Sequence, residues 1–264
     1  MGSEGRPALL SLCKAPRAAC EPRSGRSENR RIKRRTDRTV SLLPWTRPPE
    51  LTTGATNLVI VVICIVCAAR IFRIRQVGDL RLLFWILLFT IMIPTGIYGF
   101  LVHAFVLSPE TKRIAWIFLS VLLGLSTASL AVALLFEIFG RERLRAVLLS
   151  NGAAVILFAV TVCFLSKKVP NIHLVFITYT GIVFGIVLWF LIRRGKDRPH
   201  FLWYILAILT AVIGGLFEVC GDFTVSILWK FDQGSACHLA IAAALCLFAV
   251  GCCRGQNARS GRNG

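Results

Sequence analysis

The sequence predicts an all-α protein, a seven-helix transmembrane bundle that follows a disordered basic N-terminal tail. Hydrophobic residues make up 56% of the 264 residues and charged residues only 17%, which is too apolar for an ordinary soluble domain of this length. The charges also cluster between long uncharged runs. These runs lack the alternation of apolar and polar residues found in membrane β-barrels, so they favour helices.

Seven apolar runs are long enough, or nearly so, to cross a bilayer, which requires about 20 residues per helix. The first and the last run are the weakest, and the last consists largely of small residues. The transmembrane domain is therefore expected over residues 51–253, with the runs Leu51–Ala69, Leu82–Leu107, Ile114–Phe136, Ala146–Ser166, Val169–Ile192, Phe201–Trp229 and Gln233–Cys253.

The basic residues outside these runs fit a membrane protein better than a nucleic-acid-binding one. The net charge is +18, but its excess lies in the tail and in short loops beside the spans. The tail, residues 1–50, is rich in Pro, Ser and Arg, and we expect it to be disordered and either solvated or bound to a lipid surface. An organellar leader is an alternative, although its acidic residues count against one. Residues 254–264 form a short basic C-terminal tail.

The loops favour a cytosolic C-terminus in an endomembrane or the plasma membrane. Basic residues are far more frequent in the loops after the first, third and fifth runs, and in the C-terminal tail, than in the other loops. The tail before the first span argues for the opposite orientation, but most of its charge lies more than about 15 residues from that span. The first group of loops and the C-terminal tail contain Arg70, Arg73, Arg75, Arg81, Arg141, Arg143, Arg145, Arg193, Arg194, Lys196, Arg198, Arg254, Arg259 and Arg262.

Four ionisable residues within the spans fall towards the same side of the membrane. His103 ends the second run, Glu218 and Asp222 interrupt the sixth, and His238 opens the seventh. Glu218 and Asp222 are four residues apart, so a continuous helix would place them on one face. Ionisable groups inside a membrane are costly and usually mark a site or a pathway. Glu137 and His200, by contrast, are expected on the opposite side.

This set of side chains is suited to a catalytic zinc ion. His103, His238 and Asp222 would be the metal ligands, and Glu218 would transfer protons. The alternatives are that each histidine is an interfacial hydrogen-bonding residue, and that the two acids form a structural pair with His103 or His238 or lie on a helix end that emerges into water. Two histidines can share one zinc only if their rings lie within about 7 Å of each other.

Two stretches resemble the CREST superfamily of seven-helix membrane proteins, which includes alkaline ceramidases and the progestin and adiponectin receptors. The stretch from Asp232 to Gly251, DQGSACHLAIAAALCLFAVG, resembles that superfamily's last helix, which has a His at its entry. The stretch from Tyr98 to His103, YGFLVH, resembles its second helix, which also has a His near its end.

The resemblance implies a zinc site between the second and the seventh helix, used in several members to hydrolyse lipid amides. His103 and His238 match the superfamily's histidines. Ala242 stands where a second His is usual, and Gly99 stands where a Ser is expected. The acid expected early in the third helix is missing from Ile114–Phe136.

Three functions therefore stay open at this stage, and whether the protein is an enzyme is undecided. The first is a metal-dependent hydrolase of lipid amides or esters. The second is a receptor or lipid-binding protein that has lost the full metal site. The third is a proton- or ion-coupled transporter that uses Glu218 and Asp222, although no inverted repeat is apparent. The expected partners are membrane lipids and a lipid-like ligand.

Overall fold

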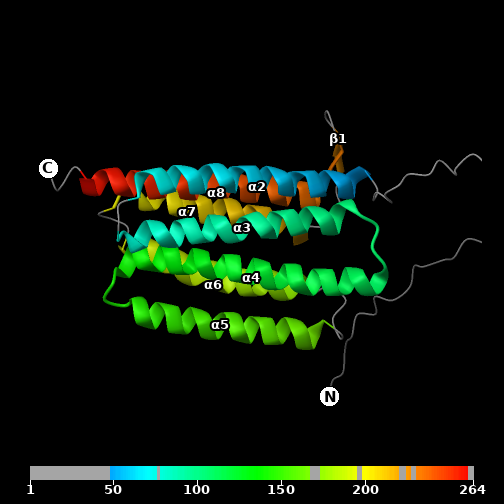
Figure 1. Cartoon of the computed structure of the whole chain (residues 1–264), viewed down its shortest axis with the longest axis horizontal. Helices are drawn as coiled ribbons and strands as arrows, with labels where there is room; N and C mark the ends of the chain where they lie inside the picture. The colour runs from blue at the N-terminus through cyan, green and yellow to red at the C-terminus, as the bar shows by residue number, and fades with distance from the viewer. Residues whose placement is uncertain are drawn as a thin grey trace, which may run out of the picture. The chain divides into compact units, whose positions relative to one another are not determined.

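The computed structural model describes residues 48–75, 78–166, 173–194, 198–219, 224–226 and 230–260 (Figure 1). The basic tail, apart from its last three residues, lies outside this part of the chain, so its predicted disorder stays a prediction. The elements in chain order are α2 (Pro48–Ile74), α3 (Leu80–Ala104), α4 (Pro109–Phe139), α5 (Leu144–Leu165), α6 (His173–Arg194), α7 (Phe201–Val219), strands β1 (Thr224–Ser226) and β2 (Lys230–Asp232), and α8 (Gln233–Ser260).

Within the described residues, seven helices are long and apolar enough to cross a membrane. The predicted fold is therefore confirmed, and the chain is a multi-pass membrane protein. Successive helices run in opposite directions (Figure 1). We call the end where α2 begins and α3 ends the N-side, and the end where α3 begins and α4 ends the C-side.

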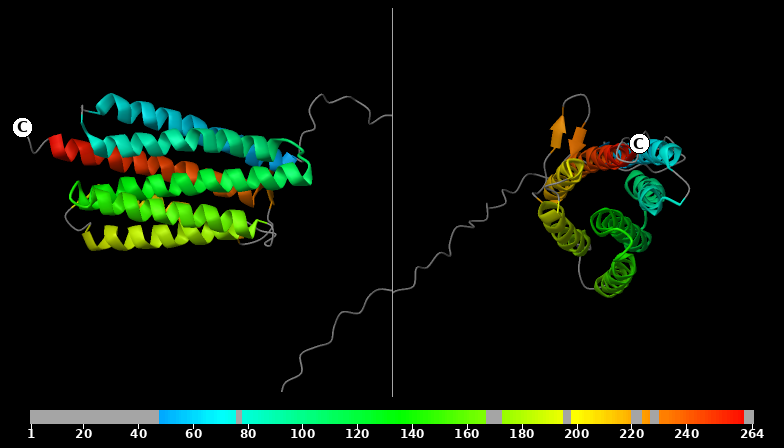
Figure 2. Two further views of the ribbon diagram at one scale, coloured as in Figure 1. Left: turned by 60° about the horizontal axis from the view of Figure 1, so that its bottom comes forward. Right: turned by 90° about the vertical axis from the view of Figure 1, so that its left-hand side faces the viewer.

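The core lies between α2, α3, α4, α7 and α8, with the second half of α6 packed against it. Trp85 stacks on Tyr204 at 5.2 Å between ring centroids, and Phe248 packs against both rings. Helix α5 lies at the periphery (Figures 1 and 2), and its buried side chains are Val147, Phe158 and Val162. The remaining side chains of α5 are available to lipid, as expected for a helix at the edge of a membrane bundle.

Close approach of α2 and α3 requires a glycine at position 96. A Cβ atom there would lie 2.7 Å from Val61 Cγ2 and 3.0 Å from the Asn57 carbonyl oxygen. Small residues let membrane helices pack with their backbones close together. In contrast, a Cβ atom added at Gly181 or Gly185, the GxxxG pair on α6, would meet no atom within 4 Å among the described residues. Packing inside this bundle therefore does not explain that motif.

Two predicted helix ends are wrong. The run predicted to form one helix over Phe201–Trp229 is divided, because α7 ends at Val219 and residues 224–226 form a strand of a hairpin. Thr224 pairs with Asp232 in that hairpin, which leads directly into α8. At the other end, α8 continues through Arg254 to Ser260, so most of the predicted C-terminal tail is helical.

We predict opposite effects for one substitution at two glycines. Gly96→Ala should lower the free energy of unfolding by about 1–3 kcal/mol, because the added methyl group overpacks the α2–α3 contact. Gly152→Ala on α5, where nothing lies within 4 Å, should leave stability unchanged or raise it by up to about 1 kcal/mol through helix propensity. Thermal unfolding of both variants in detergent measures the difference, and equal losses of stability would contradict the packing argument.

Candidate functional site

The structure brings His103 and His238 together at the N-side. His103 lies in the last turn of α3 and His238 in the second turn of α8. Their ring centroids are 5.8 Å apart with an interplanar angle of 75°. Trp116 of α4 packs edge-on against His103 at 5.2 Å. The separation lies inside the limit of about 7 Å for two histidines that share one zinc.

His238 is held by the first turns of α2. Its Nδ1 atom lies 3.1 Å from the Thr53 carbonyl oxygen and 3.1 Å from Thr56 Oγ1. A carbonyl oxygen only accepts hydrogen bonds, so Nδ1 carries the hydrogen. The neutral ring then presents the lone pair of Nε2. This arrangement, with one ring nitrogen bonded to a backbone carbonyl, is the one that fixes a metal-binding histidine.

Asp232 connects the start of α8 to α2. It accepts hydrogen bonds from the Ser235 backbone N–H at 2.8 Å, the Ser235 hydroxyl at 2.6 Å and the Thr53 hydroxyl at 2.6 Å. Partial burial raises the pKa of Asp232, but the hydrogen bonds from Ser235 and Thr53 outweigh burial and lower it below its ordinary value. The carboxylate therefore stays charged and fixes both Thr53 and the helix start that carries His238.

Asn57 fills the place where the CREST pattern expects a serine side chain. A Cβ atom at Gly99 would lie 2.8 Å from Asn57 Oδ1, so a serine would not fit unless Asn57 moved. Asn57 is buried, and its side-chain nitrogen donates to the Thr53 carbonyl oxygen at 3.1 Å. Ala242, where a second histidine is usual, is also buried. The polar groups beside the histidines thus come from α2, which the sequence pattern did not indicate.

The two acids of the predicted set have different outcomes. Glu218 lies on the N-side in the last turn of α7 and is exposed. Asp222 follows the end of α7 and lies outside the described residues, so the helix face expected to carry both acids stays a prediction. Among the residues that the structure describes, no group of three His, Cys, Asp or Glu side chains is placed to hold a metal ion.

A second polar site, missed at the sequence level, lies on the C-side. Arg81 of α3 and Glu137 of α4 form an ion pair at 3.0 Å, with side chains 1% and 0% exposed. Glu137 Oε1 also accepts from Trp85 Nε1 and from the Tyr204 hydroxyl, each at 3.2 Å. Arg81 donates to Gln256 as well. We call Arg81, Trp85, Glu137, Tyr204 and Gln256 the Arg81–Glu137 cluster, and it joins α3, α4, α7 and α8.

The sequence contains a pattern that predicts this cluster. Counting the basic residues of each loop conceals the pattern, because the count treats Arg81 as a loop residue, whereas Arg81 is the second residue of α3 and is buried. Glu137 lies on the side opposite the histidines, as predicted. An acid near the end of one apolar run and an arginine at the start of another, on the same side of the membrane, predict an ion pair between the two helices.

Comparison with protein families gives a match to a family described as a family of unknown function (DUF6962). Its model matches residues 52–257, from the second turn of α2 to the last turn of α8. Comparisons with curated proteins and with solved structures give no significant match.

We predict that the contribution of Asp232 to stability depends on pH. Because its pKa is lowered in the folded protein, the charged form stabilises the fold above the unfolded pKa of about 3.9, and this stabilisation is lost as the pH falls through the lower folded value. Asp232→Asn should therefore have a lower melting temperature than the wild type at pH 6, with the difference shrinking below about pH 4. Glu110→Gln, at an exposed position on the same side, is the control. A difference that does not change with pH would contradict the assignment.

We predict a large loss of stability when the buried ion pair is broken. Glu137→Ala should lower the free energy of unfolding by about 3–5 kcal/mol, because it leaves the Arg81 guanidinium buried without a counter-charge. Glu142→Ala, at an exposed position on the same side, should change it by less than about 0.5 kcal/mol. Denaturant unfolding followed by tryptophan fluorescence measures both. Similar values for the two variants would show that the cluster does not stabilise the bundle.

Proposed function

The chain belongs to the DUF6962 family, a family of unknown function, and we propose that it is a metal-dependent membrane hydrolase acting on lipid amides or esters. The proposed centre lies at the N-side of the bundle, with His103 and His238 as two of the metal ligands. The observation that carries the proposal is the 5.8 Å separation of the two imidazole rings, contributed by helices far apart in the sequence.

The residues around His238 support a ligand role for it. Thr53 and Thr56 hold Nδ1, so the ring has one orientation and Nε2 is the nitrogen left for coordination. Asp232 in turn holds Thr53 through the threonine hydroxyl. This chain of contacts places the imidazole before any ligand binds, which lowers the entropic cost of forming the site.

The histidine pair fits a metal ion, and the third ligand is assigned from the sequence. Asp222 stays the candidate, since α7, which precedes it in the chain, ends on the N-side, and Glu218 stays the candidate for proton transfer. A zinc ion held by two histidines and a carboxylate would supply a polarised carbonyl and a bound water of lowered pKa. Trp116, packed against His103, limits the directions from which a substrate can approach that ring.

A lipid substrate agrees with the exposure of the neighbouring helices. On the N-side, no described side chain of α6 from Leu174 to Val183 is buried, and none of α7 after Gly214 is buried. Apolar side chains such as Leu174 and Leu216 are exposed there, so lipid can contact both helices on the same side of the membrane as the histidine pair. A substrate that is itself a membrane component would reach the site without leaving the bilayer.

A second candidate is a receptor or lipid-binding protein without catalysis. It is favoured by the lack of a third His, Cys, Asp or Glu ligand near the pair among the described residues, and by Asn57 occupying the space at Gly99. In this case His103 and His238 would bind the polar head of a lipid through hydrogen bonds. The two candidates differ in whether the protein holds a metal ion.

We predict that the purified protein holds about one zinc ion per chain and that His103→Ala and His238→Ala each lose it, because each removes one ligand. Elemental analysis after exchange into metal-free buffer measures the content. Release of fatty acid from a fluorescent ceramide, and from the matching ester, should fall at least about 100-fold in both variants.

His200→Ala is the matched control, because it removes an imidazole from the C-side and should retain the metal. Circular dichroism and melting temperature show whether each variant is folded. If the wild type holds no metal while both variants fold normally, the hydrolase proposal fails. In that case the second candidate, in which the histidines bind a lipid headgroup without a metal ion, replaces the first.

A further inference from the structure

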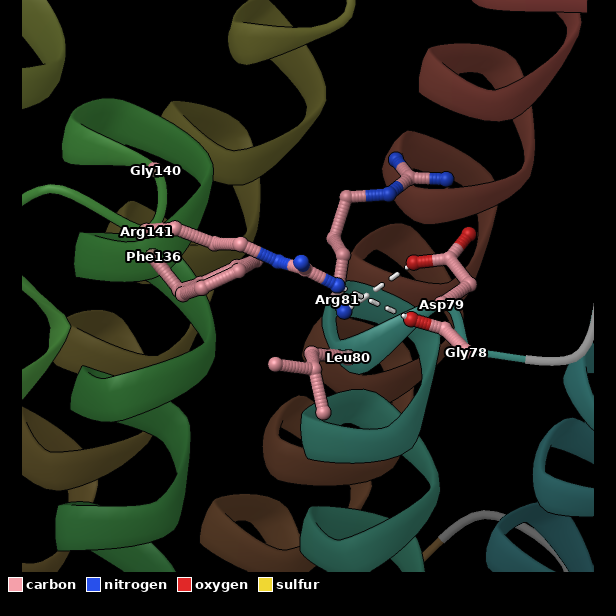
Figure 3. A pocket seen from close by; sticks show the side chains of 7 residues that line it. All are labelled: Gly78, Asp79, Leu80, Arg81, Phe136, Gly140 and Arg141. Carbon is pink, nitrogen blue, oxygen red and sulfur yellow. Dashed lines mark hydrogen bonds between the residues drawn. The ribbon is translucent and has the colours of Figure 1, made fainter.

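A small pocket opens on the C-side, between the start of α3 and the end of α4. Its volume is about 240 Å³, and it is lined by Gly78, Asp79, Leu80, Arg81, Phe136, Gly140 and Arg141 (Figure 3). It lies at the ends of two membrane-spanning helices, which is the depth of lipid headgroups. Pockets for whole drug-sized ligands are larger, about 300–1,000 Å³, so this one suits a headgroup rather than a whole lipid.

The pocket presents charges of both signs. Asp79 contributes a carboxylate from the start of α3, and Arg141 contributes a guanidinium from the end of α4, as Figure 3 shows. Within the described part of the chain these two side chains form no ion pair with each other. Asp79 Oδ1 accepts from the backbone N–H of Arg81 and Leu82, and Arg141 donates to the Gly78 carbonyl oxygen at 3.3 Å.

Arg81 provides an independent sign of a missing ligand. Its side chain is 1% exposed, and its Nη atoms are bound to Glu137 and Gln256. Its Nε atom has no hydrogen-bond partner among the described residues, although it is buried. A buried N–H group without a partner is costly, and a small turn of the Arg81 side chain towards the pocket that it lines would let an acceptor there remove that cost.

Apolar residues continue from the pocket down the outside of α3. Leu80 lines the pocket, and Leu83 and Leu87 follow it at the spacing of one helix face. Both leucines are exposed in the region where acyl chains lie. A headgroup in the pocket would thus have its acyl chains packed along this face.

We propose that this pocket binds the headgroup of a phospholipid that carries both a phosphate and a primary ammonium group, as phosphatidylethanolamine does. The phosphate pairs with the Arg141 guanidinium and accepts from Arg81 Nε, and the ammonium pairs with Asp79. Charge-assisted hydrogen bonds of this kind recognise phosphate and ammonium groups more strongly than neutral ones. The site is on the opposite side of the membrane from the histidine pair and is independent of its metal content.

The test is lipid binding to the full chain in detergent, measured by native mass spectrometry with phosphatidylethanolamine, phosphatidylcholine and phosphatidylglycerol of identical acyl chains. The wild type should bind phosphatidylethanolamine about tenfold more tightly than phosphatidylcholine, whose ammonium carries no hydrogen. Arg141→Gln should weaken phosphatidylethanolamine binding about tenfold. Asp79→Asn, which can still cap α3, should abolish the preference for phosphatidylethanolamine over phosphatidylglycerol.

Arg145→Gln is the matched control, because Arg145 is exposed on the same side but does not line the pocket. Equal binding of the three lipids to the wild type would overturn the proposal, as would an equal loss in the Arg145 and Arg141 variants, which indicates diffuse charge only. Soluble phosphoethanolamine should compete with the lipid more strongly than inorganic phosphate does. Equal competition by the two would show a phosphate site without ammonium recognition and would also overturn the proposal.

Discussion

Glu137 places a carboxylate in the interior of the bundle, and the C-side of the fold is arranged around it. Removing an acid from water costs several kcal/mol unless a counter-charge and hydrogen bonds replace the lost hydration. Here Arg81 supplies the charge, and Trp85 and Tyr204 supply two further hydrogen bonds to the same oxygen. Because these groups come from three helices, satisfying one carboxylate fixes the positions of α3, α4 and α7 together.

The two ends of the bundle stabilise their polar side chains in different ways. On the C-side, opposite charges meet in a dry cluster whose side chains also form the aromatic core. On the N-side, most of the hydrogen bonds to the histidine come from neutral groups. The carbonyl of Thr53 and the hydroxyl of Thr56 hold His238, and Asp232 accepts a hydrogen bond from the Thr53 hydroxyl. The hydrogen bonds to Thr53 and Thr56 fix the orientation of the His238 ring. Rigid support of a polar side chain is what a binding or catalytic site requires.

Lipid can contact this protein at different surfaces on the two sides of the bundle. Helix α5 and the first half of α6 bury few side chains, so the membrane itself completes their surface. On the C-side the tightly bound Arg81 also forms a wall of the pocket between α3 and α4. A side chain that is held for structural reasons there becomes part of a surface suited to a headgroup. Arg81 thus both stabilises the bundle through its ion pair and lines the pocket proposed to bind a lipid headgroup.

The sequence predicted most of the fold from hydropathy alone, because a bilayer requires about 20 apolar residues for each span and excludes unpaired backbone groups. It also placed His103 and His238 on one side, since the direction of each helix follows from the order of the spans. It could not show that α7 stops at Val219, because the sequence around residues 224–226, which form a strand, is apolar enough to predict a helix as well.

The sequence by itself thus determined the seven spans and the side of the membrane on which each polar residue lies. Only the tertiary structure decided which of those residues meet. Thr53 and Asp232 are separated by 179 positions, and Arg81 and Glu137 by 56. Apolar periodicity gives the depth of a side chain in the membrane, but its neighbour across the bundle depends on helix rotation and packing, which are set by contacts such as those of Gly96 and Gly99 with α2.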